Sequence, residues 1–136
     1  MADTNTFKLQ IISPDRIFFD DEVEMVELRT TEGDIGIMKG HIPLTAVTVP
    51  GSLIIHQSGS TKEAALHDGF IEILKDKVVI LAEACEWPEE IDINRAKEAK
   101  IRAERRLRGE EGECNMDRAE VALRKALIRL EIAENK

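Results

Sequence analysis

The first 88 residues carry short apolar stretches divided by residues that favour turns. Ser13-Pro14-Asp15, Glu32-Gly33-Asp34 and Val49-Pro50-Gly51 are three of these turn signals. Many short strands at this spacing are typical of a β-sandwich or a β-barrel. The pattern predicts strands at 7–13, 17–19, 23–29, 36–38, 44–47, 52–57, 62–67, 69–74 and 77–82.

Two of these stretches depart from a regular alternation of apolar and polar residues. The stretch 77–82 is apolar at nearly every position, although a sandwich strand normally exposes half of its side chains. We therefore expect either the C-terminal segment or a partner protein to cover its outer face. In 23–28 the alternation slips between Met25 and Val26, which indicates a bulge or a strand buried on both faces.

The pattern changes after Pro88, since all four prolines and all five aromatic residues lie at or before that position. From Ile91 onward the chain has no proline, and its only glycines are Gly109 and Gly112. Ala, Leu, Ile, Arg, Glu and Lys dominate on both sides of these glycines, which predicts two antiparallel helices joined by a short acidic loop. We accordingly predict a sandwich over 1–88 and a helical hairpin over 89–136.

Local signals predict where the two helices begin and end. Asp92 suits the N-cap or first turn of the first helix, which we expect to reach about Arg108 and to stop at Gly109 in a left-handed conformation. Residues 117–120 have the spacing of a capping box for the second helix, although Asn115 offers an alternative cap. The second helix is expected to reach roughly residue 134.

Alanine is prominent on the predicted apolar face of each helix. Small side chains let two helices approach closely, but each buries little apolar area at about 25 cal/mol per Å². A hairpin closed by such a seam is expected to leave its resting place easily, unless it is an ordinary packed hairpin. The predicted apolar positions are Ile93, Ala96, Ile101, Ala103 and Leu107, followed by Met116, Ala119, Leu123, Ala126, Leu127, Leu130 and Ala133.

Charge is distributed unevenly along the chain, whose net charge is −8. Residues 1–90 carry 7 basic and 17 acidic side chains, whereas residues 91–136 carry 12 and 10. An acidic body argues against binding nucleic acid, because phosphates require a basic surface. The basic residues near the C-terminus suit an acidic protein surface or a small anion, or they form a solvated helix face.

Arg95 and Arg102 are seven residues apart and therefore share one face of the first helix. Antiparallel packing brings that face near the end of the second helix. Clustered guanidinium groups without matching carboxylates are costly unless an anion binds between them, and a polyphosphate is one candidate. The second helix supplies Arg118, Arg124, Lys125 and Arg129.

No enzyme motif stands out in the sequence. Cys85 and Cys114 match no metal-site spacing and make no disulfide framework, and His41, His56 and His67 are too scattered to suggest a metal site. The sequence has no nucleophile elbow and no glycine-rich phosphate loop. Without a signal peptide or an apolar run that spans a bilayer, we expect a cytosolic chain that is not inserted in a membrane.

The segment Gly40-His41-Ile42-Pro43-Leu44 is the most distinctive predicted loop. Gly40 permits a positive φ, and Pro43 favours extended geometry at Ile42. Two interpretations remain open for the apolar side chains of Ile42 and Leu44. They either face the core of a rigid turn or form an exposed contact tip.

Six short patterns occur in a fixed order along the chain. Taken together and before a helical hairpin, they resemble the epsilon subunit of bacterial F-type ATP synthase over essentially the full length. The patterns are DEVEMV at 21–26, EGDIGI at 32–37, GHIPL at 40–44, DGFIE at 68–72, VVILA at 78–82 and IDxxRA at 91–96.

The resemblance implies a ten-strand β-sandwich followed by a C-terminal antiparallel two-helix hairpin. It implies a non-catalytic rotor subunit that docks on the gamma subunit and the c-ring and that couples proton translocation to ATP synthesis. The hairpin is expected to extend towards the alpha/beta catalytic head and to inhibit ATP hydrolysis. Such a subunit lies peripherally on the cytoplasmic face of the cell membrane. The resemblance places Glu32, Asp34, His41, Ile42 and Leu44 in the contacts with gamma and the c-ring.

The resemblance also implies that ATP, although not a required cofactor, binds the folded hairpin as a regulatory ligand. One position departs from the family pattern, because the ATP-binding members have arginine where this chain has Lys125. Lysine keeps the charge but lacks the planar fork, so we expect weaker binding. An alternative function is a free-standing ATP-sensing module, which would need no apolar docking face. The matching positions are Glu86, Ile91, Asp92, Arg95, Ala96, Arg102, Lys125 and Arg129.

Overall fold

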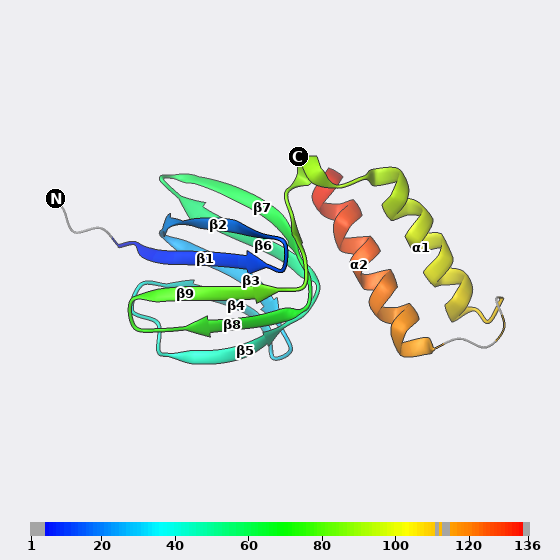
Figure 1. The fold of residues 1–136 in the computed structure, drawn as a ribbon, viewed down its shortest axis with the longest axis horizontal. Coiled ribbons are helices and arrows are strands. Elements are labelled where there is room, and N and C mark those ends of the chain that lie inside the picture. Colours follow the sequence, from blue (N-terminus) through cyan, green and yellow to red (C-terminus); the bar gives the residue numbers. More distant parts are fainter. Residues whose placement is uncertain (1–4, 111, 113–114, 135–136) are drawn as a thin grey trace. The chain divides into compact units, whose positions relative to one another are not determined.

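The computed structural model describes residues 5–110, 112 and 115–134 (Figure 1). The chain divides into two compact units, Met1–Cys85 and Glu86–Lys136. The first unit is built from β-strands, and the second contains a short 3-10 helix and two α-helices. A β-sandwich followed by a helical hairpin is the predicted fold class, which the structure confirms.

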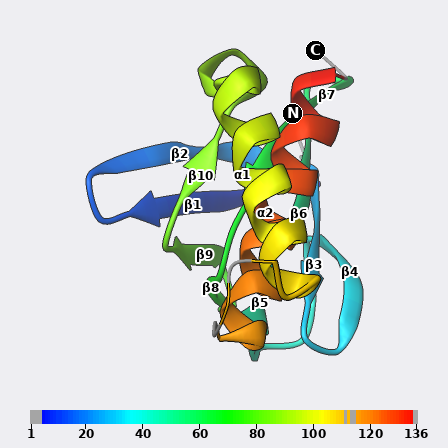
Figure 2. The same cartoon turned by 90° about the vertical axis from the view of Figure 1, so that its right-hand side faces the viewer.

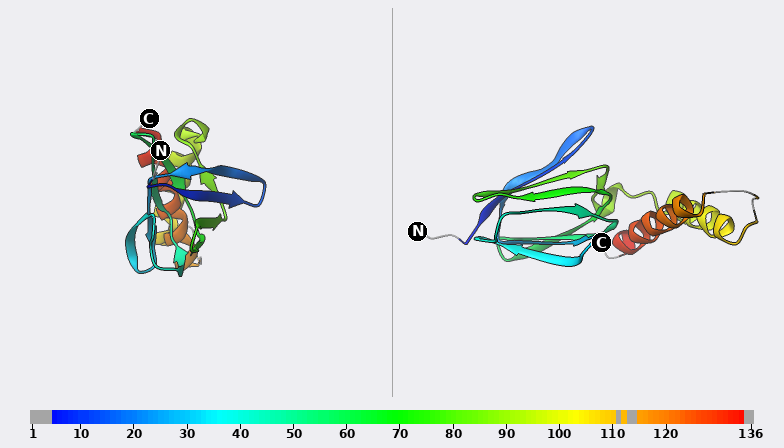
Figure 3. Two further views of the ribbon diagram at one scale, coloured as in Figure 1. Left: turned by 90° about the vertical axis from the view of Figure 1, so that its left-hand side faces the viewer. Right: turned by 90° about the horizontal axis from the view of Figure 1, so that it is seen from below.

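The strands form one sheet that folds over its own core. The hydrogen-bonded order is β10-β7-β6-β3-β5-β8-β9-β1-β2, with β4 paired to β3. Strands β1 and β9 run parallel, whereas β1 and β2 form an antiparallel hairpin that projects from one side of the unit (Figures 2 and 3). The strands are β1 (Phe7–Ser13), β2 (Arg16–Val23), β3 (Met25–Thr30), β4 (Gly33–Met38), β5 (Leu44–Thr48), β6 (Gly51–Gln57), β7 (Ser60–Leu66), β8 (Gly69–Ile73), β9 (Lys77–Ala82) and β10 (Cys85–Glu86).

Alternation along the strands places one set of side chains in the core of the sandwich. In β1, for example, every second residue from Phe7 to Ser13 is buried. Isoleucine and leucine dominate the core, and β-branched and long aliphatic side chains pack well on a pleated surface. The inward residues that are at most 3% exposed include Leu9, Ile11, Val26, Leu28, Leu53, Ile55, Ile71, Ile73, Val78 and Ile80.

All nine strands predicted from the pattern occur, but the prediction for 23–29 is wrong in one respect. Val23 ends β2 and Met25 begins β3, with Glu24 between the two strands. Burial alternates regularly inside β3. The slip in the pattern therefore marks a change of strand and not a bulge. The tenth strand, β10, has only two residues, which are too few to produce a periodic signal.

In the second unit, the 3-10 helix η1 (Pro88–Glu90) leads into α1 (Ile93–Leu107) and then α2 (Met116–Glu134). The Asp92 carboxylate caps α1 by accepting a hydrogen bond of 3.1 Å from the Arg95 N–H, and Gly109 has a φ of 77° just beyond the helix. Both predicted ends of α1 are therefore confirmed.

The start of α2 differs from the capping box predicted at 117–120. The Asn115 side chain caps the helix, since its Oδ1 accepts a hydrogen bond of 3.1 Å from the Arg118 N–H. Asp117 lies inside the first turn, because the helix already begins at Met116. The alternative cap is the correct one.

The two helices lie side by side and antiparallel in the hairpin (Figures 1 and 2). The predicted alanine seam is confirmed, but the prediction of the larger apolar positions is partly wrong. Ile93, Ile101, Met116 and Leu127 are exposed. Ile128 and Ile132 are buried on the side of α2 away from its alanines. The helical periodicity predicted one apolar face on α2 but not the second one, which carries Ile128 and Ile132. The buried alanines are Ala96, Ala103, Ala119, Ala126 and Ala133.

Candidate functional site

A cavity of about 330 Å³ lies within the second unit, between η1 and the two helices. This volume is at the lower end of the range of about 300–1,000 Å³ that is usual for small-molecule sites. Charged side chains dominate its lining. The lining residues are Glu86, Glu90, Asp92, Arg95, Ala96, Ala99, Arg102 and Arg129.

The start of α1 positions one wall of this cavity. The Asp92 cap fixes the first turn, so Arg95 follows on the first turn and Arg102 two turns later on the same face. Ala96 and Ala99 lie between the two arginines and have side chains small enough to leave space. The α1 N-terminus also presents backbone N–H groups, which favour an anion.

The three arginines of the cavity differ in whether they form an ion pair. Arg129 Nε lies 2.7 Å from Glu86 Oε1, and these side chains are 32% and 25% exposed. The guanidinium groups of Arg95 and Arg102 have no ion-pair partner among the residues that the structure describes. Two cationic groups in one cavity are therefore available for an incoming anion.

The remaining carboxylates of the cavity are engaged by backbone groups. Glu90 Oε1 accepts a hydrogen bond of 2.9 Å from the Trp87 N–H, and Asp92 accepts one from the Arg95 N–H. Guanidinium groups bind phosphate oxygens through two parallel hydrogen bonds, and the carboxylates can accept hydrogen bonds from amino or hydroxyl groups. The arrangement suits a ligand that carries phosphates at one end and polar donors at the other.

Six of the eight residues predicted for nucleotide binding line this cavity. Ile91 and Lys125 do not: Ile91 is buried just before α1, and Lys125 lies one turn before Arg129 on α2. The lining also includes Glu90 and Ala99, which the prediction did not name. The helical spacing of Ala99 from Arg95 and Arg102 is a signal that could have found it.

The five residues predicted to contact gamma and the c-ring lie at two places in the sandwich unit. Glu32 and Asp34 are at the β3–β4 turn, where Asp34 pairs with Arg29 at 3.0 Å. His41 and Ile42 follow the opposite end of β4, and Leu44 begins β5. They therefore form two separate surfaces.

The exposure of the 40–44 loop decides between its two interpretations. Ile42 is 78% exposed and Leu44 is 43% exposed. The interpretation that both side chains face the core is therefore wrong, and the loop is an exposed tip with apolar character.

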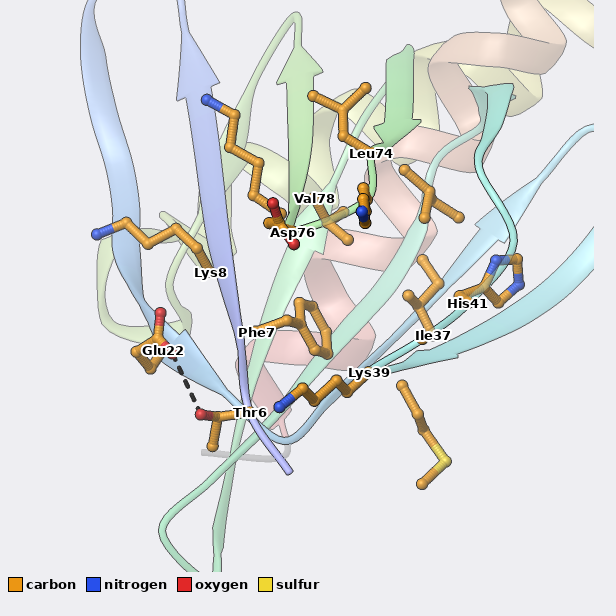
Figure 4. A pocket seen from close by; sticks show the side chains of 15 residues that line it. Thr6, Phe7, Lys8, Glu22, Ile37, Lys39, His41, Leu74, Asp76 and Val78 are labelled. Carbon is orange, nitrogen blue, oxygen red and sulfur yellow. Dashed lines mark hydrogen bonds between the residues drawn. The ribbon is translucent and has the colours of Figure 1, made fainter. Parts of the chain in front are cut away.

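A second cavity, of about 200 Å³, lies at the end of the sandwich beside His41 (Figure 4). Its rim mixes lysines with acidic residues, including Glu22, which accepts a hydrogen bond from Thr6. Lys8 pairs with Asp20 at 2.8 Å, and the hydrogen bond from Lys8 lowers the pKa of the Asp20 carboxyl. Because its charges are mixed and partly paired, this cavity selects for no ligand as clearly as the hairpin cavity does.

An apolar row crosses the outer face of the sandwich on β5, β8 and β9. Val47 pairs with Phe70 and Phe70 with Leu81, and the three side chains are 44%, 54% and 46% exposed. With Ile12 and Pro14 they line a shallow groove of about 580 Å³. Leu81 belongs to the stretch 77–82, whose outer face we expect the C-terminal segment or a partner protein to cover. We call Val47, Phe70 and Leu81 the apolar row.

Comparisons with known proteins support the resemblance seen in the sequence motifs. Residues 6–88 match the β-sandwich domain of the ATP synthase delta/epsilon chain, and residues 89–134 match its long α-helix domain. The ATP synthase epsilon chain of Caldanaerobacter subterraneus subsp. tengcongensis is 48% identical over 129 residues, which cover 94% of each chain. That of Alkaliphilus metalliredigens is 48% identical over 130 residues, which cover 96% of this chain and 97% of the relative.

Solved structures share the fold at lower identity. A chain of the Euglena gracilis mitochondrial ATP synthase, solved as OSCP/F1/c-ring, superposes with a TM-score of 0.78 at 23% identity, over 96% of this chain and 82% of that chain. A chain of the Tetrahymena thermophila mitochondrial ATP synthase central stalk and c-ring superposes with a TM-score of 0.60 at 13% identity, over 94% and 93%. Among the described residues, no helix combines the length and apolar character of a membrane span.

Proposed function

This chain belongs to the ATP synthase delta/epsilon chain family, and we propose that it is a central-stalk subunit whose hairpin senses ATP. Members with this sequence similarity are ATP synthase epsilon chains, which are non-catalytic subunits of a rotary enzyme. In this proposal the sandwich docks on a gamma subunit and the c-ring, and the complex holds it peripherally at the cytoplasmic face of the membrane. ATP is a regulatory ligand and takes no part in chemistry on this chain.

The observation that carries the ATP-sensing part is the hairpin cavity. Residues far apart in sequence, from Glu86 to Arg129, converge on it, and both helices contribute arginine. A triphosphate bound there would hold α1 and α2 together through Arg95, Arg102 and Arg129. Binding to the closed hairpin alone would lower its free energy relative to an extended one.

The proposed regulation depends on a closed hairpin that is only weakly stabilised. The seam buries alanines, which contribute less apolar area than leucines would. When ATP is scarce, the closed form loses its ligand, and the hairpin extends towards the alpha/beta head and inhibits hydrolysis. Basic side chains such as Arg105 and Arg106, exposed on α1, suit an acidic surface of that head.

The apolar row supports docking on a gamma subunit rather than a free-standing ATP sensor. Three large apolar side chains side by side on an outer sheet face are typical of an interaction surface. A free sensor needs no such surface. The free-standing module therefore remains only the alternative, and the docking test below separates the two functions.

Phe70→Asp is expected to abolish docking on the gamma subunit. A central aromatic side chain at an interface typically contributes about 2 kcal/mol or more, so a buried charge there should weaken binding by at least about thirtyfold. Co-purification and surface plasmon resonance with gamma measure the effect. Thr61→Asp, which adds the same charge to the exposed part of β7, is the control. Normal binding of a folded Phe70→Asp protein would exclude the apolar row from the interface.

Lys125→Arg is expected to tighten ATP binding about threefold to tenfold, because a guanidinium offers a planar fork where an ammonium offers a point charge. Lys125 lies one turn from Arg129, so a longer side chain there reaches towards the cavity. Calorimetric titration with ATP measures the change. The control is Arg124→Lys, the reverse exchange at the neighbouring exposed position. An unchanged affinity would remove position 125 from the site.

A further inference from the structure

The ion pair between Arg129 and Glu86 is more sheltered from solvent than the pair between Lys8 and Asp20. Its side chains are 32% and 25% exposed, against 42% and 37% for Lys8 and Asp20. The distance of 2.7 Å is that of a strong charge-assisted hydrogen bond. Both residues line the hairpin cavity, so this pair lies inside the proposed ligand site.

The pair makes Arg129 different from the other two arginines of the cavity. An anion that reaches Arg95 or Arg102 displaces no carboxylate of the described residues. An anion that reaches Arg129 meets the Glu86 carboxylate, which carries the same sign of charge. Two like charges held against the same guanidinium group in a partly buried site repel each other strongly. The phosphate and Glu86 therefore cannot both remain close to Arg129 without a large cost.

We propose that Glu86 is an internal competitor for the ligand, so that its carboxylate holds Arg129 when the site is empty and yields it to a phosphate group. This inference rests on the proposed ATP-sensing function and deepens it. It assigns Glu86 a role opposite to the ligand contact that the resemblance implies. The exchange lowers the affinity of the site, because each binding event must first break an existing ion pair.

Competition also makes the site selective for highly charged ligands. A ligand with a single phosphate that engages Arg95 or Arg102 alone leaves the Glu86–Arg129 pair intact and gains nothing from Arg129. A polyphosphate spans more than one arginine and supplies the charge that replaces the carboxylate. Glu86 is therefore a specificity-determining residue for the number of phosphates, and it acts through Arg129.

Glu86→Gln tests the competition directly, because glutamine keeps the size of the side chain and removes its charge. Calorimetric titrations of the full-length protein with ATP and with inorganic tripolyphosphate measure the effect. Tripolyphosphate has no base or ribose, so it reports on the phosphate site alone. We expect both ligands to bind about fivefold to tenfold more tightly to Glu86→Gln. Circular dichroism and thermal melting establish that the variant is folded.

Two matched variants separate competition from a general effect of charge. Glu89→Gln makes the same change outside the cavity and is expected to leave both affinities as in the wild type. Glu90→Gln makes it inside the cavity at a carboxylate that caps the Trp87 N–H. Tightening by Glu90→Gln equal to that by Glu86→Gln would assign the effect to net charge and overturn the proposal.

The remaining outcomes distinguish failure of this inference from failure of the proposed function. If the wild type binds ATP and Glu86→Gln binds it equally or more weakly, Glu86 is not a competitor. A loss of ATP affinity with tripolyphosphate unchanged would make Glu86 a contact to the base or ribose. If neither protein binds either ligand, both the ATP-sensing function and the inference are wrong.

Discussion

Deleting residues 89–136 is expected to raise ATP hydrolysis by the reconstituted synthase severalfold. In the proposed mechanism the extended hairpin is the inhibitory element, and the sandwich only holds it on the rotor. Removing the hairpin therefore removes inhibition without removing the docking surface. Steady-state hydrolysis by complexes with the full-length and truncated chains measures the difference.

The truncated chain is expected to remain folded and bound to gamma. The sandwich has its own core of fully buried side chains, such as Leu9, Ile55 and Ile80, from strands far apart in the sequence. Circular dichroism and co-purification with gamma check these two requirements. A truncated chain that carries Phe70→Asp is the matched control, since it should lose gamma. Unchanged hydrolysis by a complex that retains the truncated sandwich would contradict an inhibitory hairpin.

Arg95→Ala is expected to reduce the stabilisation of the hairpin by ATP by half or more. A charge-assisted hydrogen bond contributes about 1.5–3 kcal/mol, so its loss weakens binding by about tenfold to hundredfold. A ligand present at one hundred times its Kd stabilises the folded state by about 2.7 kcal/mol. The wild type should therefore melt at a higher temperature with ATP than without it, and the shift for Arg95→Ala at the same ATP concentration should be about half of the wild-type shift or less.

Lys97→Ala is the control for this experiment. Lys97 is an exposed cation two residues from Arg95 on α1, and it does not line the cavity. Its removal should leave the ATP-induced shift intact, apart from a small long-range electrostatic effect. Equal shifts in the wild type and Arg95→Ala would place the nucleotide elsewhere.

The features that the sequence predicts well are those with local causes. The Asp92 cap and the left-handed Gly109 depend on a few consecutive residues, and both occur as predicted. The nine strands follow from alternation within each stretch and from the turn residues between them. Arg95 and Arg102 share a face because helical geometry alone decides it.

Features that depend on distant residues were missed or misplaced. Burial of Ile128 and Ile132 gives α2 a second apolar side, which no single helical stripe predicts. The Glu86–Arg129 pair joins residues 43 positions apart, so no spacing rule reveals it. The choice of Asn115 over the 117–120 capping box depends on which turn begins the helix, because both sets of side chains have suitable chemistry.

Calorimetric titration of the intact wild-type chain with ATP tests the central claim most directly. The account predicts saturable heat with one ATP bound per chain, because arginines of both helices converge on the hairpin cavity. In this account Glu86 and Lys125 change the affinity for ATP, but neither is required for binding. A titration that remains flat into the millimolar range would contradict the ATP-sensing hairpin and leave only the stalk function.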